Sequence, residues 1–279
     1  MPIHDQGYRR YTGHREPHGR RWWVIARAGM LAVVKQRRFL GLLLVAWVPF
    51  VVRVVQIYVS QNFQQVSFLA PKAEMFRDFL GQQGIFVFFV TIAVGAPLVA
   101  NDRRANALQI YLSKPLTRVE YVVGKLAILL AFLLLVTWAP AMLLLAVQML
   151  FAGSLTFVRN NLFLVPAITL LSIVEALVAS CTMLALSSTS RSSRFVSIMF
   201  AGVMFFTSAI ANVSRAMTGR TTLAWVSPTL MLDELGDLVF RLRLRSDVPP
   251  AVAVLVIAVL ILGSIAILER RVRGVEVVT

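Results

Sequence analysis

The chain has 279 residues, of which 58% are hydrophobic and 15% are charged, with a formal net charge of +15. A soluble domain carries roughly 45–50% apolar and about 25% charged residues, so this composition argues against a soluble enzyme and favours an integral membrane protein. Lys and Arg that hold cytoplasmic loops in place account for the basic excess, and we expect no nucleic-acid partner. The single cysteine, Cys181, excludes an intrachain disulfide.

The first 38 residues form a basic arm, and its segment 20–38 has the spacing of a helix. One face of that helix holds Trp22, Ala26, Met30 and Val33. Trp22 and Trp23 suit a membrane interface, and the arginines beside them suit anionic lipid headgroups. Two interpretations stay open: a helix that also contacts a cytoplasmic partner, and a simple membrane anchor.

Six apolar runs after the arm are long enough to cross a hydrocarbon core of about 30 Å. They are Phe39–Val59, Ile85–Ala100, Val122–Phe151, Leu162–Leu186, Phe195–Val213 and Val248–Leu268. The second run is short, which predicts a start nearer Phe79, and the third is long enough to tilt or project from the bilayer. The expected fold is therefore all-α and polytopic: an arm over residues 1–38, then one six-helix transmembrane domain over 39–279.

Orientation follows from the distribution of Lys and Arg between these runs. Most of them lie in the arm, in the loop after the second run, in the loop after the fourth run and at the C-terminus. This bias places both termini in the cytoplasm, and an even number of spans fits that placement.

The cytoplasmic loop 101–121 is predicted to contain a short helix. Asp102 is suited to N-cap it, and Pro115 disfavours a helical conformation at Lys114, so the helix should stop there. Its apolar face would hold Leu108, Tyr111 and Leu112.

A second cap follows that stop. Thr117 and Glu120 have the spacing of a capping box, which opens the next helix. A short helix held between two spans, with Arg103 and Arg104 near its start, is typical of a surface that docks on another protein.

This loop resembles the cytoplasmic coupling loop of ABC-2 type ABC transporter permeases. In that family an acidic residue follows the second span, a short helix ends near a Leu-Ser-x-Pro turn, and an acidic residue and Gly-Lys open the third span. The matching residues are Asp102, Leu112-Ser113-Lys114-Pro115, Glu120 and Gly124-Lys125. Many members have Glu and a small residue where this chain has Asp102 and the bulkier Arg103-Arg104, a departure that bears on the choice of partner.

The resemblance implies a permease that pairs with a second copy or a homologue and docks on a separate ABC ATPase, which binds ATP and Mg²⁺. The chain itself has no Gly-x-x-x-x-Gly-Lys-[Ser/Thr] loop, so we expect no cofactor on it. It would be an exporter subunit surrounded by lipid in the bacterial cytoplasmic (inner) membrane. The expected coupling residues are Asp102, Arg103, Arg104, Leu108, Tyr111, Leu112, Lys114 and Pro115.

The outer loop 214–247 predicts one further helix. Ser227-Pro228 reads as an N-cap followed by proline at the first helical position. The segment 229–242 is amphipathic and should lie in the outer interface or re-enter the membrane. Its expected apolar face holds Leu235, Leu238, Val239 and Leu242, opposite Asp233 and Asp237.

Two charged residues fall inside the spans, Arg53 and Glu175. Intramembrane charges usually face a cavity or a partner, so they are candidates to line a path or to pair with each other. Arg53 can instead snorkel to the outer surface, whereas Glu175 at mid-span favours a functional or interhelical role. Four prolines within the spans predict kinks of mainly structural origin: Pro49, Pro97, Pro140 and Pro166.

The residues show neither a catalytic constellation nor metal-ligand spacing, so we expect no enzyme activity on this chain. Two other functions stay open. A secondary transporter would need repeated halves and coupling-ion residues at the midplane, and only Glu175 qualifies. A permease-like subunit that anchors a surface assembly machine would share the same sequence features. A membrane enzyme acting on lipid would need clustered carboxylates, His or Ser at a membrane face, which we do not find.

Overall fold

The computed structural model describes residues 21–62, 72–107, 117–152, 159 and 161–271. Within these ranges the regular structure is helical, and six helices are long and apolar enough to cross a membrane, as predicted. The six candidate spans are Arg37–Asn62, Ala73–Arg104, Arg118–Phe151, Leu164–Thr189, Ser193–Thr218 and Pro250–Arg271. The chain is therefore an all-helical, multi-pass membrane protein. Most of the loop with the expected coupling residues lies outside the described residues, namely Leu108, Tyr111, Leu112, Lys114 and Pro115.

Several spans consist of more than one helix. The first three comprise α2 (Arg37–Ala46) with α3 (Val48–Asn62), α4 (Ala73–Val90) with the π-helical turn η2 (Thr91–Gly95) and α5 (Ala96–Arg104), and α7 (Arg118–Val136) with α8 (Trp138–Ala152). The others are α10 (Leu164–Thr189), α11 (Ser193–Thr218) and α13 (Pro250–Arg271). Outside the spans lie α1 (Arg21–Val34), the short η3 (Ala224–Val226) and α12 (Pro228–Val239).

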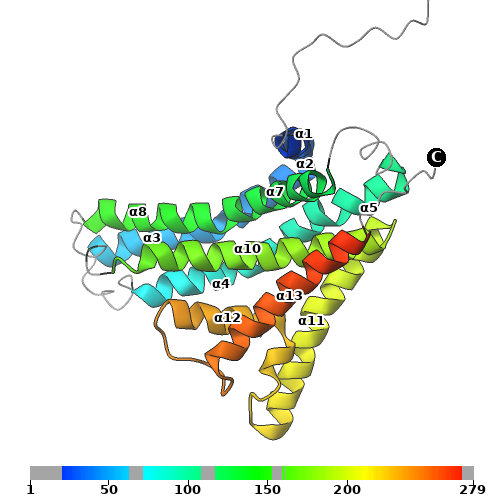
Figure 1. Ribbon diagram of the computed structural model, residues 1–279. Coiled ribbons are helices and arrows are strands. Elements are labelled where there is room, and N and C mark those ends of the chain that lie inside the picture. Colours follow the sequence, from blue (N-terminus) through cyan, green and yellow to red (C-terminus); the bar gives the residue numbers. More distant parts are fainter. Residues whose placement is uncertain (1–20, 63–71, 108–116, 153–158, 160, 272–279) are drawn as a thin grey trace, which may run out of the picture.

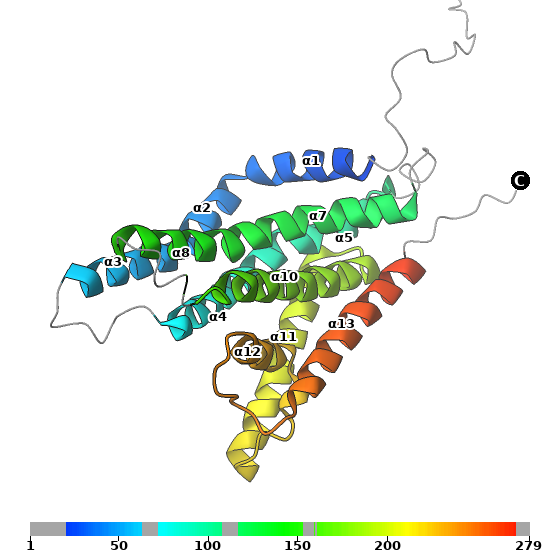
Figure 2. The same ribbon diagram turned by 60° about the vertical axis from the view of Figure 1, so that its left-hand side comes forward.

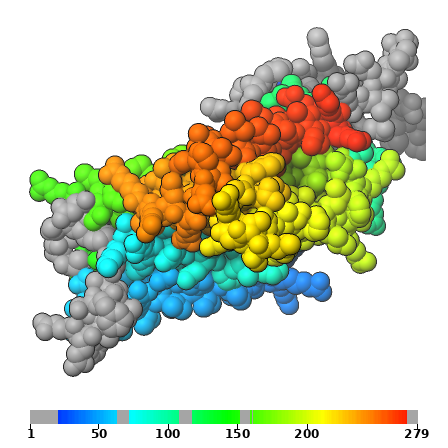
Figure 3. All heavy atoms as spheres, turned by 90° about the horizontal axis from the view of Figure 1, so that it is seen from below, coloured from blue at the N-terminus to red at the C-terminus, as the bar shows by residue number. Residues whose placement is uncertain are grey.

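The helix α10 occupies the centre of the bundle. The second and third spans lie alongside it, the first span packs against α4 and α8, and α11 and α13 diverge from the bundle on one side (Figures 1 and 2). The helix α12 fits between α13 and α10, and seen from below α11, α12 and α13 form one continuous layer (Figure 3). Because α10 is covered by neighbours from several spans, most of its second half is buried.

The second span begins earlier than expected. It starts at Ala73, not at Ile85 or Phe79, and it continues to Arg104. The added turns carry Arg77 and Gln83, which dilute the apolar pattern in the sequence. Both side chains are nevertheless buried inside the bundle, where they find polar partners.

Three of the four prolines lie just after a break in their span, as expected for a residue that cannot donate a backbone hydrogen bond. The first span breaks at Trp47, two residues before Pro49, and the third breaks at Thr137, three residues before Pro140. The π-helical turn Thr91–Gly95 ends two residues before Pro97. Pro166 lies in the first turn of α10, where proline is tolerated, and no break occurs there.

Polar side chains from neighbouring spans stabilise these breaks. Gln83 donates from its side-chain nitrogen to the carbonyl of Ala46, 3.2 Å away, beside the break in the first span. At the second span, Ser187 Oγ accepts from the backbone nitrogens of Val99 and Ala100 and donates to the carbonyl of Ala96. The freed backbone groups are thus satisfied within the bundle, as an apolar environment requires.

The buried side chains of the spans form two main clusters that follow one another along the bundle. The first cluster joins α1, α2, the middle of the second span, α7, the second half of α10 and the start of α11. The second cluster joins α3, the start of α4, α8, the start of α10 and Phe240. The boundary falls between Ala46 and Ile57 in the first span, and between Val136 and Ala141 in the third.

The N-terminal helix packs along α7, and the predicted apolar face is the face that makes this contact. Ala26 and Val33 are buried, and Trp22 and Met30 pack against the first cluster. The helices approach closely at Gly124, where a Cβ atom would lie 2.9 Å from the backbone oxygen of Trp22. This explains glycine at that position.

The helix of the arm is shorter than predicted. It ends at Val34, and Arg37 and Arg38 begin α2, the first helix of the first span. Trp23 points away from the contact with α7 and is 51% exposed. Its placement at a membrane interface stays a prediction.

Candidate functional site

The first candidate site is the junction between α5 and α7, on either side of the segment 108–116. Asp102 Oδ2 lies 2.7 Å from Lys125 Nζ and accepts a hydrogen bond of 2.7 Å from the Tyr121 hydroxyl. The Lys125 and Asp102 side chains are only 10% and 17% exposed, and Tyr121 is fully buried. The ammonium of Lys125 also lies 5.5 Å from the centre of the Tyr121 ring, within the range of a cation–π contact.

Local sequence explains why Asp102 reaches this position. Asn106 adopts a left-handed conformation, with φ of +51°, and so ends the helix after Arg104. Asp102 therefore belongs to the last turn of α5, and the prediction that it caps a new helix is wrong. A carboxylate near a helix C-terminus is unfavourable, and the ion pair with Lys125 offsets that cost.

The two arginines after Asp102 have different surroundings. Arg103 donates from its guanidinium to the carbonyl oxygen of Ser188, at the end of α10, so it is held by its own chain. Arg104 is exposed. Of this pair, Arg104 is the one whose charge faces outward for a contact with another molecule.

The predicted capping box at the start of α7 is confirmed. Thr117 Oγ1 accepts from the backbone nitrogen of Glu120 at 3.2 Å, and the Glu120 carboxylate accepts from the backbone nitrogen of Thr117 at 2.9 Å. Each helix that flanks the segment 108–116 is thus fixed at the end that borders it: α5 by the contacts of Asp102 and Arg103, and α7 by its capping box.

A second group of charges connects α4 to α12 inside the bundle. Arg77 Nε donates to Asp237 Oδ1 at 2.9 Å, and its Nη2 donates to Asp233 Oδ1 at 2.9 Å. The Arg77 and Asp237 side chains are 4% and 1% exposed. Arg245 Nε lies 2.7 Å from Asp237 Oδ2 and completes the group.

These contacts show which face of α12 meets the bundle. The N-cap at Ser227 with Pro228 at the first position is confirmed, with Ser227 Oγ accepting from the Leu230 nitrogen. The acidic face packs inward, since Asp237 is fully buried, whereas Leu238 of the predicted apolar face is 41% exposed. The face turns inward because α4 presents the guanidinium of Arg77 there.

The helix α12 also lies alongside the spans and not beyond their ends. Ser227 at its start is hydrogen-bonded to Ser208, which lies within α11 ten residues before that helix ends, at 2.9 Å. At its far end, Arg241 lies over the ring of Phe163, 4.8 Å from the ring centre and next to the start of α10. Whether α12 lies in the interface or re-enters the membrane stays a prediction.

Glycine at position 236 allows α12 to approach α4 closely. A Cβ atom there would lie 2.6 Å from Arg77 Nε and 3.1 Å from Leu171 Cδ2. A larger residue would therefore displace the arginine from its two carboxylates.

The two intramembrane charges singled out from the sequence do not pair with each other. Arg53 donates to Gln56 one turn further along α3, at 2.8 Å. Glu175 on α10 faces α4, where a Cβ atom on Gly84 would lie 3.6 Å from its Oε1. The buried arginine Arg77, which forms ion pairs, lies before the predicted start of the second span near Phe79, so the sequence did not single it out as an intramembrane charge.

Comparison with known proteins does not assign the chain to a family. No family model matches the sequence, and no curated protein matches it. Within the described residues there is no group of three or more His, Cys, Asp or Glu side chains placed to hold a metal ion.

Proposed function

We propose that this protein is the transmembrane permease subunit of an ATP-driven ABC-2 type transporter, an exporter that works with a separate ABC ATPase and a second permease copy or homologue. The observation that carries the proposal is the pair of fixed helix ends around the segment 108–116. Asp102 ties α5 to α7 through Lys125 and Tyr121, and the Thr117 capping box fixes the start of α7.

Two helix ends fixed in this way suit the transmission of force. A push on residues 108–116 reaches two spans at once, because both flanking helices are anchored in the bundle. Arg103 extends the connection to α10 through Ser188. The exposed Arg104 adds a positive charge beside the segment for an acidic partner surface.

The partner would supply the energy, because the chain has no phosphate-binding loop of its own. Nucleotide-driven movement of that partner would shift α5 and α7 together. The resemblance of residues 102–125 to the coupling loop of ABC-2 permeases supports the same division of labour.

The test is purification of the full chain from its native membrane, followed by identification of any bound protein with a phosphate loop. Leu108→Asp should reduce recovery of that ATPase at least tenfold while membrane insertion is kept, since a charge replaces an apolar contact at the expected interface. Leu244→Asp, the same change in the exposed loop after α12, is the matched control and should leave recovery unchanged. Equal recovery with both variants, or full transport with no ATPase present, contradicts the proposal.

A further inference from the structure

A small cavity lies where α11, α12 and the loop before α13 meet, apart from the α5–α7 junction. Its volume is about 180 Å³, below the roughly 300–1,000 Å³ that is usual for pockets of drug-sized ligands. The end of α11 forms one wall, together with Thr221 and Ala224 after it. The other walls come from the α12 residues Leu230, Asp233 and Glu234 and from the loop residues Arg245 and Ser246. A cavity of this size suits a headgroup and not a large substrate.

One wall carries a buried carboxylate, that of Glu234. Glu234 is 3% exposed, and its Oε1 atom has no hydrogen-bond partner among the described residues. Leaving a buried carboxylate unpaired is costly. Because the neighbouring arginines do not pair with Glu234, it calls for a cationic hydrogen-bond donor inside the cavity.

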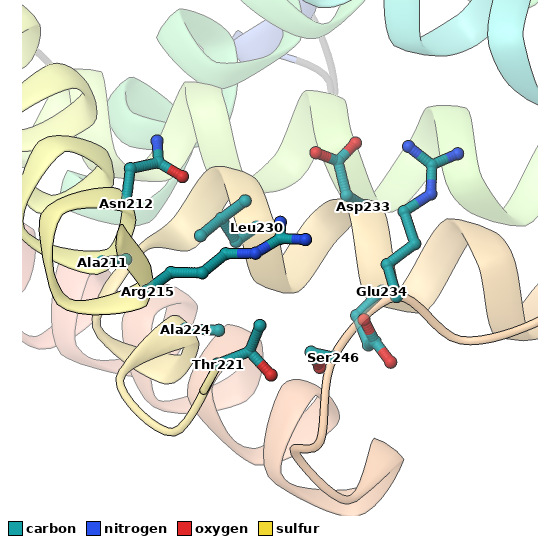
Figure 4. Close-up of a pocket in the computed structure, with 10 residues that line it drawn as sticks. Ala211, Asn212, Arg215, Thr221, Ala224, Leu230, Asp233, Glu234 and Ser246 are labelled. Carbon is teal, nitrogen blue, oxygen red and sulfur yellow. The ribbon is translucent and has the colours of Figure 1, made fainter. Parts of the chain in front are cut away.

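The opposite wall carries a cation. Arg215 extends from α11 across the cavity toward the helix that bears Asp233 and Glu234 (Figure 4). It forms no ion pair within the described part of the chain. A guanidinium of this kind binds phosphate in a two-point contact.

The cavity is also held open by a rigid frame. Thr221 Oγ1 accepts from the backbone nitrogen of Asp247 at 2.7 Å and donates to its carboxylate at 3.0 Å, so the two loops that border the cavity are clamped together. The α12 wall is fixed by the ion pairs of its Asp233 and Asp237 with Arg77. Arg215 and Glu234 therefore line a space whose borders are fixed by these contacts.

We propose that this cavity binds a zwitterion that carries a primary ammonium and a phosphate, with the ammonium on Glu234 and the phosphate on Arg215. The ethanolamine headgroup of a phospholipid has this chemistry, and so does free phosphoethanolamine. The position favours the lipid, because the cavity lies at the end of a candidate span and Trp225 beside it is 48% exposed, as is common at the level of lipid headgroups. The proposal does not depend on the transport function.

The experiment measures lipid retention by the full-length protein in nanodiscs that contain equal amounts of phosphatidylethanolamine, phosphatidylcholine and phosphatidylglycerol. Phosphatidylcholine lacks the ammonium hydrogens, and phosphatidylglycerol lacks the ammonium. After delipidation, the retained lipid should be enriched in phosphatidylethanolamine. Glu234→Gln should reduce the enrichment about tenfold, because a charge-assisted hydrogen bond is lost, and Arg215→Gln should reduce it as well.

Matched controls exclude general effects of the bilayer. Glu74→Gln and Arg243→Gln change exposed residues outside the cavity and should keep the enrichment. Free phosphoethanolamine is added in a second arm, to protein in pure phosphatidylcholine discs. Glu234-dependent binding there supports the same site with a soluble source. Equal retention of the three lipids with no binding of free phosphoethanolamine, or an enrichment that survives Glu234→Gln, overturns the proposal.

Discussion

Lys125 Nζ lies 2.7 Å from Asp102 Oδ2, and the two residues come from helices on either side of the segment 108–116. Both side chains are largely shielded from solvent, so the pair is more than a surface contact. It ties α5 to α7 close to the ends of these two helices that border the segment 108–116.

Replacing Lys125 with Met should therefore destabilise the protein by about 3–5 kcal/mol, because Asp102 would remain buried without its counter-charge. Lys35→Met changes an exposed lysine on the neighbouring arm and serves as the control. Thermal unfolding in detergent measures both. Equal melting temperatures for the two variants would show that the pair contributes nothing to stability.

Arg77→Met should have a similar or larger effect, about 3–5 kcal/mol, since it leaves Asp237 buried with only the more exposed Arg245 beside it. The double variant Arg77→Met with Asp237→Leu removes both buried charges and should regain a good part of this loss. Arg53→Met, which removes only a bond to Gln56, is the matched control. A double variant less stable than Arg77→Met alone contradicts this account.

Gly124→Ala should loosen α1 from α7, because the new Cβ would lie 2.9 Å from the backbone oxygen of Trp22, which cannot rotate away. The expected cost is about 1–3 kcal/mol. Hydrogen exchange of the α1 amides should speed up. Gly202→Ala, a glycine with open space around it, should leave exchange unchanged; unchanged exchange in Gly124→Ala as well would count against a close contact.

Ser187→Ala should weaken the second span at its break, because backbone groups there would lose their hydrogen-bond partner. Its hydroxyl serves the amides of Val99 and Ala100 and the carbonyl of Ala96, and losing such buried bonds costs about 1–3 kcal/mol. Faster hydrogen exchange at these two amides is the readout. Ser197→Ala, which removes only a bond within α11, should not change it.

The expected orientation can be tested with single cysteines in a Cys181→Ala background. Arg191, between α10 and α11, and Arg243, between α12 and α13, are both exposed. If both termini are cytoplasmic, an impermeant maleimide added to intact cells should label Arg243→Cys and not Arg191→Cys. Inverted membrane vesicles should give the reverse pattern, and labelling of Arg191→Cys in intact cells would contradict the orientation.

The features that could be predicted from the sequence are those set by neighbouring residues. The six spans follow from apolar length, and the caps at Thr117 and Ser227 follow from residues within three positions of each other. These signals are local and do not depend on how the helices pack.

The features that could not be predicted depend on contacts between distant parts of the chain. Arg77 and Asp237 are 160 residues apart, and only their pairing makes an acidic face of α12 turn inward. Asp102 likewise reads as a cap until Lys125, in the next span, is seen to neutralise it. Sequence periodicity assigns a charged face to solvent, and it cannot detect a counter-charge buried in another helix.

The position of the helix breaks has a mechanical consequence. The breaks at Trp47 and Thr137 coincide with the boundary between the two clusters of buried side chains. The helices α4 and α10, in contrast, run unbroken through this boundary and contribute side chains to both clusters. Two continuous helices therefore brace the bundle against bending at the level where the first and third spans are interrupted.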